Sequence, residues 1–197
     1  MARRRTLLIG LTLAVLVGVA AAWLLVSRFG SAPPQAPADT VRSATPVSTG
    51  PERKITATMY FISEDGMALV GVQREVPFGE PIAEQARLLV EAQLENAPEP
   101  LARAVPAGTT LRGLYLTDAG DAFVDLSDEA RTRHTGGALN ELFTIYAIVD
   151  ALTVNLPSVR RVQILVNGRE VDTLAGHVDL RHPLEKNLTW VRTEKDE

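Results

Sequence analysis

The chain has 197 residues, of which 46% are hydrophobic and none is cysteine. It is therefore long enough for one domain with a real core, and it has no disulfide, thiolate chemistry or lipid-modified cysteine. The net charge of −4 is unevenly distributed, because the first 30 residues carry four arginines and no acid, which leaves 16 basic and 24 acidic side chains elsewhere. An acidic remainder argues against a nucleic-acid partner, since neutralisation of phosphates dominates that binding.

An uncharged, mostly apolar run of 21 residues, 6–26, follows the arginines Arg3 to Arg5. About 20 such residues span a bilayer core as a helix. Arginines before the run favour a cytoplasmic N-terminus. A cleaved signal peptide with its site at Ala20 to Ala22 is the alternative, but the apolar run continues beyond that site to Val26. We therefore predict an uncleaved signal anchor within residues 1–29, in a single-pass protein of the cell membrane whose C-terminal domain is extracytoplasmic.

Residues 30–54 are rich in proline, alanine, serine and threonine, which favours an extended, semi-rigid tether over a packed element. Residues 191–197 are mostly charged and are predicted to form a solvated tail. A single domain, residues 55–190, lies between the two.

Within this domain the patterns predict strands and helices in the order β-β-α-β-β-α-β-β. Alternating residues, bounded by turn-forming ones, indicate strands at 55–61, 68–76, 109–117, 122–126, 162–166 and 169–174. An amphipathic helix is expected from Pro81 to the prolines at 98 and 100. The fold class predicted is α+β, a two-layer sandwich in which a mixed or antiparallel sheet carries two helices on one face.

The second helix, Leu139 to Leu156, is apolar on more than half of its circumference, which indicates a helix buried in the core. Pro157 ends it, because proline cannot donate the next backbone hydrogen bond. Asn167-Gly168 between two β-prone runs predicts a hairpin with a type I′ turn.

Several motifs occur in an order and spacing that resemble the GerMN domain family, over roughly residues 55–189. The resemblance is carried by Gly136-Gly137 with Asn140-Glu141, by Tyr146 to Thr153, by Pro157-x-Val159-x-x-Val162, by Val166-Asn167-Gly168, by Gly176 to Leu180 and by Pro183-Leu184; upstream it is carried by Tyr60-Phe61, Arg74 to Pro77, Val105 to Thr109 and Val124 to Ser127. It implies a fold like that of ring-building motifs and a non-enzymatic interaction module in envelope, sporulation or germination complexes, with ring-like assembly in some cases. The chain departs from the family's pattern in having one such domain where GerM resembles a tandem pair, and in lacking a cysteine for lipid anchoring.

The candidate site is the start of the second helix together with the loop after the hairpin, and its residues are Gly136, Gly137, Asn140, Glu141, His177 and Asp179. A carboxylate in the first helical turn can bond N–H groups that have no helical partner, which favours a self-satisfied helix start. The other interpretation is a pocket or docking point in which the glycine N–H groups receive an anion.

Residue types that bind metals occur together at two places in the sequence. The first place has residue types that bind zinc, namely His177, Asp179, His182 and Glu141, but their spacing is not that of a zinc site. We therefore expect His177 to bond backbone groups of its own loop and Asp179 to hold that loop in place. The acidic residues near the second half of the domain, Asp121, Asp125, Asp128 and Glu129, do not match an EF-hand loop. We predict no enzyme activity, no cofactor and no metal.

The function predicted is a membrane-anchored, extracytoplasmic scaffold module of the GerMN type. Its expected partners are other envelope proteins and the membrane, and self-association into a homo-oligomer could use the sheet edges. The alternative is a module that binds, or hydrolyses, cell-wall glycans or peptides through the candidate site.

Overall fold

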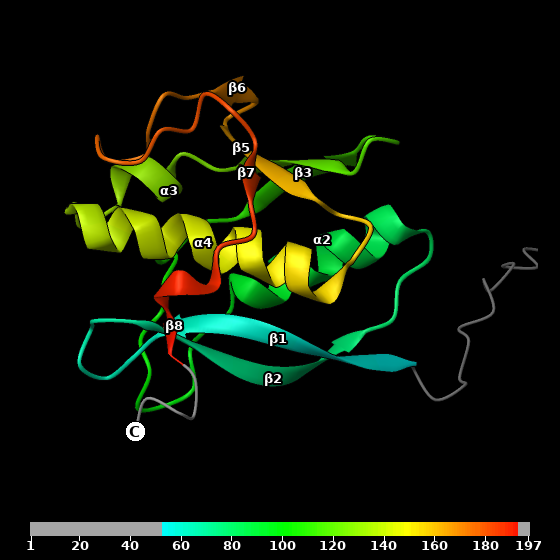
Figure 1. Cartoon of the computed structure of the whole chain (residues 1–197), viewed down its shortest axis with the longest axis horizontal. Helices are drawn as coiled ribbons and strands as arrows, with labels where there is room; N and C mark the ends of the chain where they lie inside the picture. The colour runs from blue at the N-terminus through cyan, green and yellow to red at the C-terminus, as the bar shows by residue number, and fades with distance from the viewer. Residues whose placement is uncertain (1–52, 193–197) are drawn as a thin grey trace, which may run out of the picture. The chain divides into compact units, whose positions relative to one another are not determined.

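The computed structural model describes residues 53–192, and Figure 1 shows their arrangement. The predicted anchor, nearly all of the tether and residues 193–197 lie outside the described residues. The strands and helices in chain order are β1 (Lys54–Ile62), β2 (Leu69–Pro77), α2 (Ile82–Gln93), β3 (Leu111–Leu116), β4 (Asp121–Leu126), α3 (Glu129–Thr132), α4 (Ala138–Asn155), β5 (Arg161–Val166), β6 (Arg169–Glu170), β7 (Leu184–Glu185), a 3-10 turn (Leu188–Trp190) and β8 (Val191–Arg192).

The strands form two separate sheets, and the two long helices lie between them (Figure 1). One sheet has the order β1-β2-β8, and the other has the order β3-β4-β5-β6 with β7 beside β5. Helix α4 contacts β1 in the first sheet and β5 in the second, while α2 contacts β1 and β2 in the first and β3 in the second. The α+β class is confirmed, but the helices have a sheet on both sides instead of a single sheet on one side.

The composition of α4 explains this arrangement. Its residues from Phe143 to Ile145 and from Ala147 to Thr153 are buried without interruption, so every side of the helix is covered. One sheet could cover only one stripe of such a helix, and burial of the opposite apolar side removes further apolar surface from water. The helix ends before Pro157, as the sequence predicts. Among the helices of residues 53–192, none combines the length and apolar composition that crossing a membrane requires.

The predicted hairpin is present between β5 and β6. Asn167 and Gly168 have φ values of 51° and 71°, the positive values that a type I′ turn requires. The N–H of Gly168 donates to Oδ1 of Asp125 over 2.7 Å, which fixes the turn against β4. Strand β6 has two residues and not the six predicted for 169–174, because the chain leaves the sheet at Val171 to reach the start of α4.

The segment predicted as the beginning of a solvated tail is part of the first sheet. Val191 and Arg192 form β8, which pairs in parallel with Leu69 and Val70 of β2. The guanidinium of Arg192 also lies 2.7 Å from the carboxylate of Asp65. The domain therefore extends to residue 192.

The outer edge of β1 is closed by side-chain amides. The amide of Asn155, at the end of α4, accepts from the N–H of Thr58 and donates to its carbonyl, both over 2.8 Å. The amide of Gln93, at the end of α2, does the same for Tyr60, over 2.8 and 2.7 Å. Each amide takes the place that a residue of a neighbouring strand would occupy.

A backbone bridge completes this edge, since Ile62 exchanges two hydrogen bonds with Ala102 over 2.8 and 2.9 Å. Three alternate residues in the second half of this edge, Thr58, Tyr60 and Ile62, therefore all have partners. An exposed sheet edge is a template for unwanted pairing with another chain, and here the helices and a loop remove it.

We predict that Gln93→Ala destabilises the domain by about 2–5 kcal/mol, because it leaves the buried N–H and carbonyl of Tyr60 without partners. The free energy of unfolding in urea measures this change. Gln73→Ala, at an exposed position of β2, is the matched control and is expected to stay within about 0.5 kcal/mol of the wild type. Equal effects of the two substitutions would contradict the proposed edge closure.

Candidate functional site

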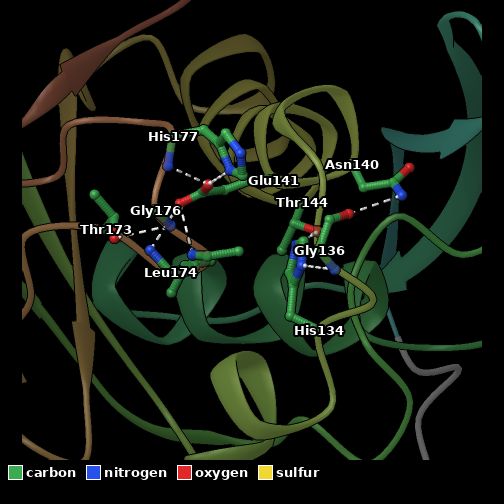
Figure 2. A network of polar contacts seen from close by, with 10 residues as sticks. His134, Gly136, Asn140, Glu141, Thr144, Thr173, Leu174, Gly176 and His177 are labelled. Atoms are coloured by element: carbon green, nitrogen blue, oxygen red, sulfur yellow. Dashed lines mark hydrogen bonds and ion pairs between the residues drawn. The ribbon is translucent and has the colours of Figure 1, made fainter.

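The candidate site is built around the first two turns of α4 (Figure 2). The chain enters the helix through Gly136 and Gly137, whose φ values of 81° and 87° lie in the region that favours glycine. Asn140 is exposed, and its amide donates to the carbonyl of Gly136 over 3.1 Å. These three predicted residues therefore shape the turn into the helix.

Glu141 is fully buried, and the partners of its carboxylate come from the loop after β6. Its Oε1 accepts from the N–H groups of Leu174 and Ala175, each over 2.8 Å. Its Oε2 accepts from the N–H of His177 over 2.7 Å and from Nδ1 of His177 over 3.0 Å. Burial raises the pKa of this carboxyl, but the N–H donors outweigh burial and hold the pKa below its ordinary value.

This geometry differs from both sequence interpretations. The carboxylate neither completes its own helix start nor faces an open pocket, because it fastens a loop 33 to 36 residues away in the chain to α4. Each oxygen already accepts two hydrogen bonds, and the group has no contact with solvent. Glu141 thus has a structural role, and it is not placed to take a proton from a substrate.

His177 and Asp179 are not brought together. The side chain of His177 is 43% exposed, and its Nδ1 must carry a proton because it faces a carboxylate oxygen. Asp179 instead pairs with Arg181, over 2.9 and 2.7 Å to the guanidinium, and also accepts from the N–H of Arg181. These contacts agree with the expectation that Asp179 holds its own loop in place. His177 was expected to bond backbone groups of that loop, but its ring bonds the carboxylate of Glu141 instead.

The other carboxylates weighed as metal ligands are dispersed. Asp121 pairs with Arg161 over 2.7 Å, and Asp125 bonds the hairpin turn and Arg112. Within residues 53–192 no three histidines or carboxylates lie together in a group that could hold a metal ion.

A second polar chain at the same helix end was not predicted. The N–H of Gly136 donates to Nδ1 of His134 over 2.9 Å, so Nε2 carries the proton of the neutral ring and donates to the hydroxyl of Thr144, 3.2 Å away (Figure 2). That hydroxyl donates in turn to the carbonyl of Ala104 over 2.6 Å. Burial lowers the pKa of His134, in agreement with a neutral ring.

His134 and Thr144 also line a surface cavity of about 350 Å³. The lining of the cavity combines apolar residues, among them Ile62 and Pro106, with two arginines, Arg103 and Arg133. Asn140 is the one predicted site residue that lines it. Arg103 lies in a loop and Arg133 directly follows the short helix α3, so no spacing in the sequence relates the two.

Asp150, in the middle of α4, is a further buried acid that the sequence analysis did not select as a site residue. Its Oδ1 accepts from the N–H of Asn187 over 2.9 Å, whereas Oδ2 has no hydrogen-bond partner among the described residues. Burial raises its pKa to about 6, although the N–H of Asn187 and the charge of Lys186 act in the opposite direction.

Comparisons with known proteins place the chain beside sporulation proteins. The family model described as "Germane: Sporulation and spore germination" matches residues 58–172. The first GerMN domain of the sporulation protein GerM from Bacillus subtilis is similar in structure, with a TM-score of 0.52 and 19% identity, over 66% of this chain and 97% of that domain. The tandem GerMN domains of the same protein give a TM-score of 0.49 and 21% identity, over 73% of this chain and 48% of the tandem pair. No curated protein matches the sequence significantly.

We predict that Glu141→Gln destabilises the domain by about 2–4 kcal/mol, because the new amide group would point a donor at N–H donors. Chemical denaturation measures the loss, and hydrogen exchange at Leu174 and His177 should accelerate. Glu170→Gln, at an exposed position of β6, is the control and should leave both quantities unchanged. Normal protection of the loop in Glu141→Gln would show that the carboxylate does not hold it.

The raised pKa of Asp150 predicts a pH-dependent effect of Asp150→Asn. Between the ordinary value of 3.8 and about 6, the folded wild type binds more protons than the unfolded chain, so its stability falls as the pH rises. Asparagine cannot ionise, so the stability of the variant relative to the wild type should rise over this interval by up to about 3 kcal/mol and then stay level. Unfolding free energies measured from pH 4 to pH 8 test this.

The exposed Asp118→Asn, in the turn before β4, controls for the loss of one negative charge. A constant difference between Asp150→Asn and the wild type over the whole pH range would contradict the assignment.

Proposed function

Because the chain belongs to the Germane family of sporulation and spore germination domains, we propose that residues 53–192 form a non-enzymatic interaction module within a complex of the cell envelope. This membership confirms the GerMN resemblance drawn from the sequence. In the proposal the apolar run 6–26 anchors the module in the cell membrane, and the proline-rich tether holds it on the extracytoplasmic side.

The observation that carries the proposal is the open edge of β3. This strand pairs only with β4 in the part of the chain that the structure describes, so one side of it has no neighbouring strand. The N–H of Thr117 bonds the carbonyl of Asp121, and alternation along the ladder then directs the backbone groups of Leu114 and Leu116 outward. Within residues 53–192 no side-chain amide closes this edge, in contrast to the edge of β1.

An aromatic side chain stands beside this edge. Tyr115 is 65% exposed, and its ring lies along the strand over Gly113, where an added Cβ would come within 3.2–3.4 Å of the ring and hydroxyl. A strand edge supplies backbone groups for pairing, and a neighbouring exposed aromatic adds apolar contact area that can select a partner. The edge therefore suits addition of a strand from another envelope protein or from a second copy of this chain.

The internal use of the candidate site also favours a module without chemistry of its own. Glu141 has all of its accepting positions filled by the loop, and Asp179 is paired with Arg181. A nucleophile or general base needs a free, reachable atom near the substrate. Binding of a cell-wall peptide or glycan remains the second candidate, and the cavity beside Asn140 is what favours it.

We expect residues 49–197 to self-associate in a concentration-dependent manner and Tyr115→Lys to weaken this association by at least tenfold. A lysine beside an edge strand places charge where the partner strand would lie, which natural proteins use to prevent edge pairing. Light scattering across a concentration series measures the mass. Gln73→Lys adds the same charge to an exposed position of β2 and should behave as the wild type.

A monomeric mass at every concentration would contradict pairing between copies of this chain through β3. Equal weakening by the two lysine substitutions would instead assign the association to net charge and not to β3.

A further inference from the structure

The cavity beside α4 has a composition that the proposed scaffold role does not use. It holds about 350 Å³ and is open to solvent, within the size range of pockets for small molecules. Ile62 and Pro106 in its lining offer apolar contact. Arg103 and Arg133 also line it and bring two positive charges.

Both arginines are held in place by neutral groups. Arg103 donates to the carbonyl of Leu94 and, over 3.2 Å, to the side-chain carbonyl of Asn96. Arg133 donates to the carbonyl of Ala107 over 3.3 Å. Neutral acceptors position a guanidinium without cancelling its charge, so each group keeps donors for an anion.

Gly108 provides the room for Arg133. A Cβ at this glycine would stand 2.6 Å from Nη1 of Arg133, closer than real Cβ contacts. Its φ of 86° is also a conformation that other residues rarely adopt. The guanidinium of Arg133 thus lies against the loop before β3.

Six of the twelve arginines in residues 53–192 form ion pairs with carboxylates, and Arg103 and Arg133 are not among them. Carboxylate partners are present for Arg74, Arg87, Arg112, Arg161, Arg181 and Arg192. Within residues 53–192 no carboxylate lies within ion-pair distance of Arg103 or Arg133. Hydrogen bonds from Ser127 and from its own backbone N–H lower the pKa of the Glu129 carboxyl, and the nearby charge of Arg133 adds to this effect. The cavity therefore carries two guanidinium charges without an ion pair, of which that of Arg133 is partly offset by Glu129.

His134 contributes no charge to this site. Both of its ring nitrogens are occupied in the chain from Gly136 to Thr144 and Ala104, which fixes the neutral form. The anion-binding capacity of the cavity rests on the two arginines, while His134 and Thr144 line it as neutral groups.

We propose that this cavity binds a small organic carboxylate with a short apolar body, its carboxylate bound by Arg103 and Arg133 and its apolar part against Ile62 and Pro106. Two guanidinium groups can each offer paired N–H donors to carboxylate oxygens. The ligand could be a free acid or the C-terminal residue of a peptide, because both present the same carboxylate. The proposal goes beyond the interaction role of β3 and does not depend on it.

The test titrates the full chain with hexanoate and with tri-alanine bearing a free carboxyl group, and with the amide of each, by isothermal titration calorimetry. We expect saturable binding in the millimolar range by at least one carboxylate, weakening as salt is added, and none by its amide. Preference for hexanoate indicates a free acid as the natural ligand, and preference for tri-alanine indicates a peptide terminus.

Two variants assign the binding to the cavity. Arg133→Gln, at an exposed position, should weaken binding by about tenfold or more while the fold stays intact. Arg103→Lys keeps the charge but loses the planar donor fork, and should weaken binding less. Arg169→Gln, on β6 away from the cavity, is the charge-matched control, and Tyr115→Lys should bind as the wild type does. Absence of saturable binding, equal binding of acid and amide, or equal effects of Arg133→Gln and Arg169→Gln would overturn the proposal.

Discussion

The buried carboxylate of Glu141 is the interaction on which the last part of the domain depends. The chain between β6 and β7 has no regular structure, yet Leu174 and Leu180 are buried in the core. A buried charge is costly unless donors surround it, and buried N–H groups are costly unless they find an acceptor. The N–H groups of the loop from Leu174 to His177 donate to the carboxylate of Glu141, so the buried charge has donors and the buried N–H groups have an acceptor. The loop can therefore pack without a strand to hold it.

Much of the fold could be predicted, because local patterns decide it. The apolar surface around Leu139 to Leu156 predicts a buried helix, and Asn167-Gly168 predicts its hairpin; both are present. The arrangement of two sheets around the helices was not predicted, although the composition of α4 indicates it, because a helix that is apolar all round must be covered on both sides. The short β8 was missed because Val191 and Arg192 join the sheet through pairing with Leu69 and Val70, and two residues carry no detectable pattern.

The site was predicted less completely, because its contacts are distant in the chain. Sequence reasoning selected Glu141 and His177, which do meet, but it assigned neither the right partner. Nothing in the sequence around Leu174 indicates that the backbone N–H groups of this loop face a carboxylate. Arg103, Arg133 and His134 lie in segments without periodicity, and only the tertiary structure brings them around one cavity. Buried glutamines such as Gln93 were assigned to no role, since a polar residue in an amphipathic helix normally faces water.

Two of the sheet edges, those of β1 and β3, show how backbone groups at an edge can be closed or left available. Side-chain amides from both helices occupy the edge of β1, so pairing there would first require breaking buried hydrogen bonds. Strand β3 is short, and its ladder is irregular between Leu111 and Gly113, which disfavours indiscriminate pairing. A partner for β3 must therefore match a few outward backbone groups and the exposed ring of Tyr115 together. For the proposed interaction module this means that backbone pairing would supply affinity, while the side chains beside the strand would supply selectivity.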